Sequence, residues 1–219
     1  MKLPVVRERA FAYSCQACGA CCTDKRITLS PYELARLAEA IGATTRVVLE
    51  RHTDEGGTVL RFDAHGCTFK DGARCRAHGG RPLACRLYPL GRIVDEHGDE
   101  TFVEVAPHPD SKGIYGGPGT IASYLEAQGT EPFVAWAARY SAVARKIFAR
   151  LDEAEGGAEA FREVVTTPVA IASDWLDVDA VVARAGSARG IPVPADVEAR
   201  GAIHLEELEA WVASPGSVS

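Results

Sequence analysis

The cysteines are the residues of this sequence whose spacing points to chemistry. All seven lie in the first 85 of the 219 residues: Cys15, Cys18, Cys21, Cys22, Cys67, Cys75 and Cys85. The first four form a Cys-x2-Cys-x2-Cys-Cys run, in which each two-residue gap lets a tight turn direct two sulfurs at one ion. Gly19 suits such a turn, because glycine adopts backbone angles that a side chain would forbid. We therefore predict that this run binds metal.

A second group of donors follows further along the chain and consists of Cys67, Cys75, His78 and Cys85. With the first run it gives eight potential ligands, which suits two four-coordinate sites, or one cubane cluster and one mononuclear site. His78 is as readily explained as an exposed loop histidine. Adjacent side chains tend to point apart. Cys21 and Cys22 should therefore serve two metals, two irons of one cluster, or one metal and one packing role.

Arginines crowd the second group, at Arg74, Arg76, Arg81 and Arg86. They could offset thiolate charge, lower the pKa values of the thiols or bind an anionic partner. For most of them we favour a plainer role, in which Arg81 and Arg86 brace the loop by bonding backbone carbonyls. Pro82 is expected to begin a helical turn that carries Cys85.

The cysteine count and the composition favour a reducing compartment. Seven thiols cannot all pair within one chain, and clustered cytosolic cysteines are typical of metal sites. The first 14 residues lack the apolar core of a secretory signal, and no apolar stretch approaches the roughly 20 residues that span a bilayer. We expect a cytoplasmic protein with no membrane contact.

Short elements must position these donors. The capping box Ser30-Pro31-Tyr32-Glu33 predicts a helix that ends at Gly42, and a second helix is expected over 45–51. A strand is expected over 58–62, with hairpins around Asp71-Gly72 and His97-Gly98.

Residues 110–219 favour helices. One long helix carries Phe133, Trp136 and Tyr140 on one face, and shorter helices are expected around 158–165, 174–185 and 204–213. The Pro- and Gly-rich segment 107–119 is the best candidate boundary. We predict an α+β fold in which a small metal-knotted lobe with short β-hairpins (1–109) packs beside a mainly helical C-terminal half (110–219).

Charge is uneven along the chain. Residues 1–109 hold 15 Lys and Arg against 14 Asp and Glu, whereas residues 110–219 hold 9 against 16, a net charge of −7. An acidic half does not favour nucleic-acid binding, whose usual signature is a basic face. A protein partner could meet this acidic helical half.

The order and spacing of the motifs resemble a known family. Over about residues 11–105 the chain has Cys-x2-Cys-Gly-x-Cys-Cys, then Cys-x-Phe, then Cys-x2-His-x2-Arg-Pro-x2-Cys-Arg-x-Tyr-Pro. This pattern is similar to the YkgJ-type cysteine-cluster family, whose members are described as zinc- or iron-chelating domains. The resemblance implies that all seven cysteines bind metal, while His78 stands where family members have His or Tyr. The run also resembles the cluster segment of the longer flagellin lysine-N-methylases.

Three functions fit these observations. The first is a metal-binding protein in which zinc or an iron–sulfur cluster, for example of the 4Fe-4S type, folds the N-terminal half. The second is an iron–sulfur oxidoreductase-type enzyme. The third is a structural zinc protein that acts as a non-catalytic interaction module. We favour iron–sulfur slightly over zinc because the adjacent cysteines fit a multi-metal site. No Gly-x-Ser-x-Gly, P-loop or His-Glu-x-x-His motif supports other catalysis.

Overall fold

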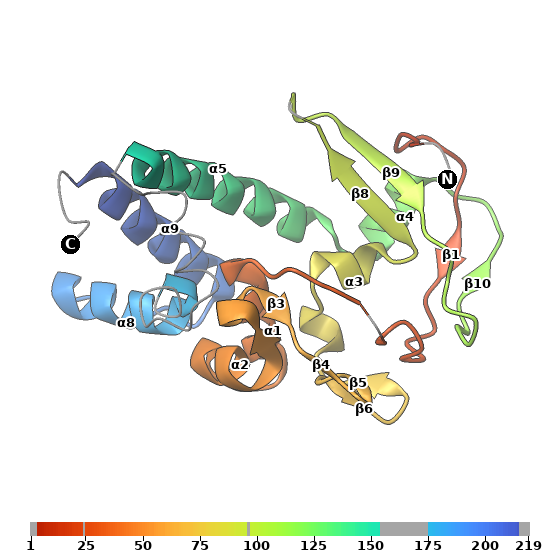
Figure 1. Ribbon diagram of the computed structural model, residues 1–219, viewed down its shortest axis with the longest axis horizontal. Helices are drawn as coiled ribbons and strands as arrows, with labels where there is room; N and C mark the ends of the chain where they lie inside the picture. Colours follow the sequence, from red (N-terminus) through yellow and green to blue (C-terminus); the bar gives the residue numbers. More distant parts are fainter. Residues whose placement is uncertain (1–3, 24, 96, 154–174, 215–219) are drawn as a thin grey trace. The chain divides into compact units, whose positions relative to one another are not determined.

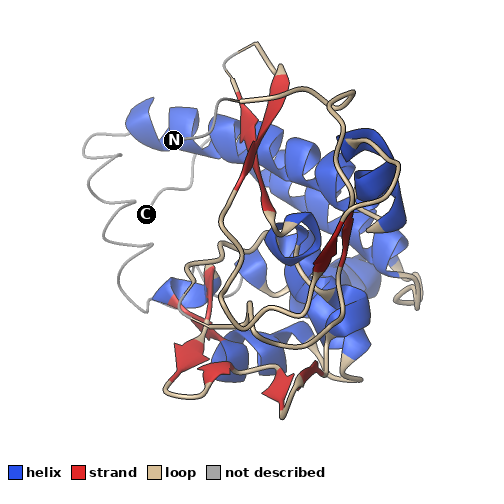
Figure 2. Ribbon diagram, turned by 90° about the vertical axis from the view of Figure 1, so that its right-hand side faces the viewer, coloured by secondary structure: helices blue, strands red, loops and turns tan. Residues whose placement is uncertain are grey.

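The computed structural model describes residues 4–23, 25–95, 97–153 and 175–214. These residues form helices and short antiparallel strand pairs, the α+β class that the sequence predicts (Figures 1 and 2). The helix expected over 158–165 lies outside the described residues. No helix among those described is long and apolar enough to cross a membrane.

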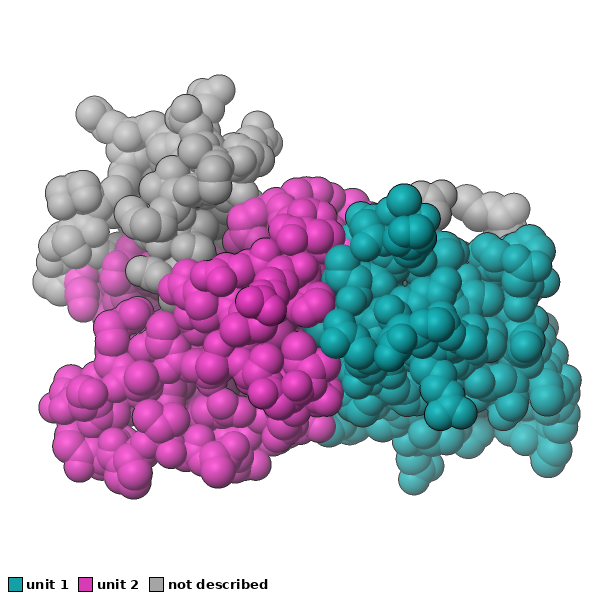
Figure 3. All heavy atoms as spheres, turned by 90° about the horizontal axis from the view of Figure 1, so that it is seen from below, with its two compact units in different colours: residues 1–25, 62–134 teal, residues 26–61, 135–219 magenta. Residues whose placement is uncertain are grey.

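Two compact units make up the chain, and each takes two stretches of sequence (Figure 3). Unit 1 comprises residues 1–25 and 62–134, and unit 2 comprises 26–61 and 135–219. All seven cysteines belong to unit 1. The units therefore interleave along the sequence, and the metal-binding and helical domains expected at 1–109 and 110–219 stay a prediction.

The part of unit 1 that the structure describes contains four antiparallel strand pairs. They are β1 (Tyr13–Ser14) with β10 (Ile114–Tyr115), β4 (Phe62–Asp63) with β5 (Gly66–Cys67), β6 (Lys70–Asp71) with β7 (Arg74–Cys75), and β8 (Leu90–Val94) with β9 (Glu100–Glu104). The pairs β6–β7 and β8–β9 confirm the two predicted hairpins. Because these strands are short, packing of side chains must supply most of the stability of this unit.

The core of unit 1 gathers residues from distant parts of the chain. Its buried members are Phe11, Tyr13, Leu87, Leu90, Phe102, Ile121, Tyr124 and Leu125. They come from the N-terminal segment, from the helices α3 (Leu83–Leu87) and α4 (Ile121–Ala127), and from the β8–β9 hairpin. The predicted turn after Pro82 is thus a helix, and it carries Cys85, which is half-buried.

Unit 2 is mainly helical. The helices among its described residues are α1 (Pro31–Ala40), α2 (Thr45–His52), α8 (Val178–Arg189), α9 (Val197–Ala213) and the part of α5 (Glu131–Glu153) from residue 135 onward. Ser30 and Glu33 form the predicted capping box. The helix α1 packs against α8 and α9, and the Tyr32 ring stacks on Trp136 at 5.1 Å. The strand expected over 58–62 is divided, because β3 (Val59–Leu60) pairs with β2 (Thr53–Asp54) while residue 62 belongs to β4.

A histidine is fully buried inside unit 2. The side chain of His204 on α9 is 0% exposed. Its Nε2–H donates to the Trp175 carbonyl at 2.8 Å, and its Nδ1 accepts from the Tyr140 hydroxyl at 3.0 Å. The ring is therefore neutral with both nitrogens satisfied. Burial lowers its pKa to about 4.

This histidine makes the stability of unit 2 sensitive to acid. The unfolded chain protonates His204 near pH 6.5, whereas the folded chain does so near pH 4. The free energy of unfolding therefore falls as the pH falls from about 6.5 to 4, and His204 accounts for roughly 3 kcal/mol of this loss. Urea unfolding at pH 7 and pH 4 measures the loss. His204→Gln should be less stable at pH 7 but lose roughly 3 kcal/mol less between the two values, and an equal loss in both proteins would contradict the assignment.

Candidate metal centre

The structure brings the two cysteine groups together in unit 1. The Cys67 amide donates to the Cys22 carbonyl at 2.9 Å, which joins the first run to the strand β5. The glycine before it, Gly66, has φ +106°, and a Cβ there would lie 2.3 Å from the same carbonyl oxygen. On the other side of the run, Gly19 lies against the Ala73 carbonyl in the β6–β7 turn. The first run therefore lies directly on the segment that carries the second group.

Five of the thiols are close enough to affect one another electrostatically: Cys21, Cys22, Cys67, Cys75 and Cys85. Burial raises the pKa of Cys85 strongly, and the charges of Cys67, Cys21 and Cys75 raise it further. Cys67 and Cys75 follow the same pattern, with burial as the larger cause. A cluster of buried thiols that oppose one another's ionisation needs a cation to become a set of thiolates.

Backbone amides point at several of the sulfurs in a repeated pattern. The Ala17 amide donates to Cys15 Sγ at 3.4 Å. In three more places the backbone amide two residues after a cysteine donates to its sulfur. These bonds run from Ala20 to Cys18, from Phe69 to Cys67 and from Ala77 to Cys75. Each such bond favours the thiolate form. At Cys18 the Lys112 amide lowers the pKa most, and the Ala20 amide lowers it further. Hydrogen bonds to sulfur are also a means by which proteins tune metal–thiolate centres.

The adjacent pair Cys21 and Cys22 behaves differently from expectation. The two side chains were predicted to point apart, but they share a hydrogen bond, so that prediction is wrong. The bond lowers the pKa of Cys21 and raises that of Cys22, which makes Cys21 the thiolate and Cys22 the donor. The turn at Gly19, whose carbonyl accepts from the Cys22 amide at 3.0 Å, overrides the usual divergence of neighbours.

A lysine that sequence reasoning passed over lies among these thiols. Lys25 follows the first run, and its charge acts on Cys21, Cys22 and Cys85. Burial lowers its pKa while the thiolates oppose that change. Its Nζ lies 3.6 Å from the centre of the Tyr88 ring, a cation–π contact. Lys25 thus supplies positive charge where thiolates gather. Its position one turn after the run was the only sequence signal for this role.

His78 is held by an arginine rather than by the cysteines. Its Nδ1 lies 3.3 Å from Arg81 Nη1, and a guanidinium can only donate, so Nδ1 accepts and Nε2 carries the ring proton. Burial and the charges of Arg81 and Arg86 lower the pKa of the ring. The role of His78 as a ligand stays a prediction.

The predicted bracing by arginines is confirmed. Arg86 donates to the carbonyls of Arg81, Gln128 and Gly79 at 3.0, 2.8 and 2.5 Å, and its guanidinium lies 4.1 Å from the Phe133 ring. Arg81 donates to the His78 carbonyl at 2.8 Å and to the Gln128 side chain. These bonds fix the helix that carries Cys85.

The fit to a metal follows from the donor set. All seven cysteines are free thiols. Thiolates are soft ligands, which suit zinc and iron–sulfur centres rather than magnesium or calcium. Within the described ranges, no three His, Cys, Asp or Glu side chains converge on one point as a finished coordination shell. The fold therefore brings the donors near one another without forming a complete coordination sphere. We assign individual ligands only as a proposal.

Comparison with known proteins agrees with the chemistry of the donors. No curated protein and no solved structure matches the chain. Residues 14–108 match the CxxCxxCC family, described as a "putative zinc- or iron-chelating domain". The match spans both cysteine groups and confirms the resemblance seen in the sequence. Residues 14–108 of this chain, a little under half of its length, are therefore similar to the CxxCxxCC domain.

Proposed function

We propose that this chain is a metal-binding protein in which the thiolates of its seven cysteines hold zinc or iron. The observation that carries the proposal is the repeated amide-to-sulfur bond at Cys15, Cys18, Cys67 and Cys75. Such bonds stabilise thiolates, and the chain builds four of them in two segments that it then joins through Cys22 and Cys67. Thiols that are buried only to fill the core stay protonated, so bonds that stabilise the thiolate form would not contribute to their packing.

Between the two metals we favour an iron–sulfur cluster. A zinc site and an iron–sulfur cluster both take four thiolates, so the choice depends on the adjacent pair. The hydrogen-bonded pair Cys21 and Cys22 brings two sulfurs to one place, where they can bind neighbouring irons of one cluster. When bound, such a cluster supplies one-electron transfer. The chain's own contribution is the buried charge of Lys25 and the amides aimed at sulfur, both of which favour electron-rich thiolates.

The test is metal analysis of protein expressed in a reducing cytoplasm and purified without oxygen. We expect iron and inorganic sulfide, with a broad absorption band near roughly 400 nm. Cys85→Ser should lose most of this metal because Cys85 lies within electrostatic reach of Cys21, Cys67 and Cys75 and so belongs to the centre of the set. Zinc on a colourless protein would instead support the structural zinc module, in which metal binding contributes folding free energy. Purified protein without either metal, which takes up neither on reconstitution, would contradict the proposed function.

A further inference from the structure

A segment outside both cysteine groups closes over the first of them. We call residues 108–115 the strap. The Lys112 amide of the strap donates to Cys18 Sγ at 3.4 Å. At the end of the strap, β10 pairs with β1, which places Ile114 opposite Ser14, the residue just before Cys15. The strap therefore meets the first run at its two leading cysteines.

Several contacts fix the strap in this position. The His108 amide donates to the Tyr88 hydroxyl at 2.6 Å, and the Ser111 amide donates to the His108 carbonyl at 2.8 Å. The Ser111 hydroxyl lies 3.2 Å from the Tyr13 hydroxyl. A Cβ at Gly113 would lie only 1.9 Å from that same Tyr13 oxygen, so only glycine fits there. The strap is thus a built part of the site rather than a free loop.

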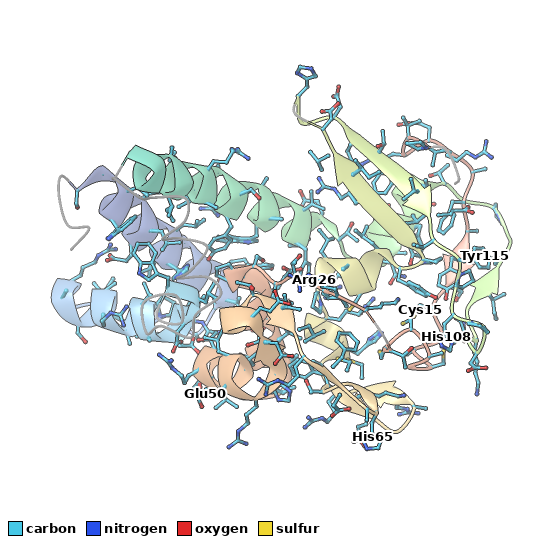
Figure 4. All side chains as sticks on the ribbon, viewed as in Figure 1. Cys15, Arg26, Glu50, His65, His108 and Tyr115 are labelled. Carbon is cyan, nitrogen blue, oxygen red and sulfur yellow. The ribbon has the colours of Figure 1, made fainter. Side chains whose placement is uncertain are left out.

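The strap carries a histidine toward the thiols. Figure 4 shows His108 in the same part of unit 1 as Cys15. The His108 amide is bonded to Tyr88, whose ring contacts the Lys25 ammonium beside the thiols, so His108 lies close to the thiol cluster. Its side chain is about one-third exposed, at 36%, and its Nδ1 faces Asp110, with the amide at 3.1 Å and Oδ2 at 3.8 Å. These contacts at Nδ1 orient the ring.

We propose that His108, rather than His78, is the nitrogen ligand of the metal centre. This assignment rests on the proposed function and adds a donor that lies outside the cysteine motif. A neutral imidazole binds a metal through the Nε2 lone pair when its ring proton is on Nδ1. The Asp110 carboxylate is the acceptor within reach of that proton, and it would replace the Asp110 amide at Nδ1. Carboxylate–histidine–metal chains of this kind are common around bound metals.

His78 lacks these features. Its Nδ1 accepts from the Arg81 guanidinium, whereas the Nδ1 of His108 faces a backbone amide and a carboxylate, both from Asp110. The positive charges of Arg81 and Arg86 also oppose a metal cation at this ring. Of His78 and His108, the environment of His108 is the better one for a ligand.

Cobalt(II) titration of reduced, metal-free protein tests the assignment. His108→Ala and His78→Ala form a matched pair, since each removes one imidazole from unit 1. We expect His108→Ala to bind Co²⁺ about tenfold more weakly or worse, with shifted d–d bands, because loss of a second-shell partner alone weakens metal binding by about 10–100-fold. We expect His78→Ala to match the unaltered protein in both affinity and spectrum.

A third variant separates ligand loss from disturbed folding. His108→Cys keeps a donor at the position, so it should restore affinity and strengthen the thiolate-to-cobalt absorption. Unchanged affinity and spectrum in His108→Ala would overturn the assignment, as would the same losses in His78→Ala. If the unaltered protein binds no cobalt, zinc or iron, the proposed function itself fails, and this assignment fails with it.

Discussion

Replacing Gly66 with alanine is expected to separate the two cysteine groups and abolish most metal binding. The new Cβ would lie 2.3 Å from the Cys22 carbonyl oxygen, a backbone atom that cannot rotate away. Gly66 also has φ +106°, which costs a residue with a side chain about 1–2 kcal/mol. Overpacking adds about 1–3 kcal/mol, so the free energy of unfolding should fall by about 3 kcal/mol. Relief of the clash requires the Cys67 amide and the Cys22 carbonyl to move apart.

The matched control is Gly72→Ala in the neighbouring hairpin. Gly72 also has positive φ, at +56°, but a Cβ there would meet nothing within 4 Å. The Gly72→Ala substitution should lower the free energy of unfolding only by the conformational strain of about 1–2 kcal/mol. It should leave the metal content of the purified protein unchanged. Elemental analysis and urea unfolding of the two variants give the comparison. Equal metal content in both would show that the contact between Gly66 and Cys22 is not needed for binding.

Local signals in the sequence predicted the elements of this fold well. The capping box at Ser30 and Glu33, the hairpin turn at Asp71-Gly72 and the helix start at Pro82 all appear where expected. Each depends on residues within a few positions of one another, so the chain itself carries the information. Bracing of the Arg81 and Gly79 carbonyls by Arg86 was predictable for the same reason, but its bond to the Gln128 carbonyl, 42 residues away, was not.

Contacts between distant segments were not predictable. The periodicity of α1 shows that one face is buried, but not that the partners are α8 and α9, and this packing interleaves the two units along the chain. A hydrogen bond from a backbone amide does not depend on the type of side chain. The identity of Lys112 therefore does not indicate that its amide donates to Cys18 Sγ. The error at Cys21 and Cys22 has a similar origin, because the turn at Gly19 sets the directions of both side chains.

Replacing Arg86 with alanine is the other change for which we expect a large effect. The side chain is 7% exposed and donates to three carbonyls, those of Gly79, Arg81 and Gln128. Its removal leaves these acceptors without their donor, at about 1–3 kcal/mol for each one that stays buried. It also removes the contact with the Phe133 ring. We expect the free energy of unfolding, measured in urea, to fall by about 3–5 kcal/mol.

The comparison variant is Arg76→Ala, because Arg76 follows Cys75 as Arg86 follows Cys85. Arg76 is exposed and makes one long bond to the Thr68 carbonyl at 3.4 Å, so its loss should cost about 0.5 kcal/mol or less. Arg86→Lys keeps the charge, but an ammonium lacks the planar fork that reaches three carbonyls, so we expect an intermediate loss. If Arg86 acted only by attracting thiolate charge, Arg86→Lys would keep full stability. Because Arg86 fixes the helix that carries the Cys85 thiol, metal content should follow the same order as stability across the three variants.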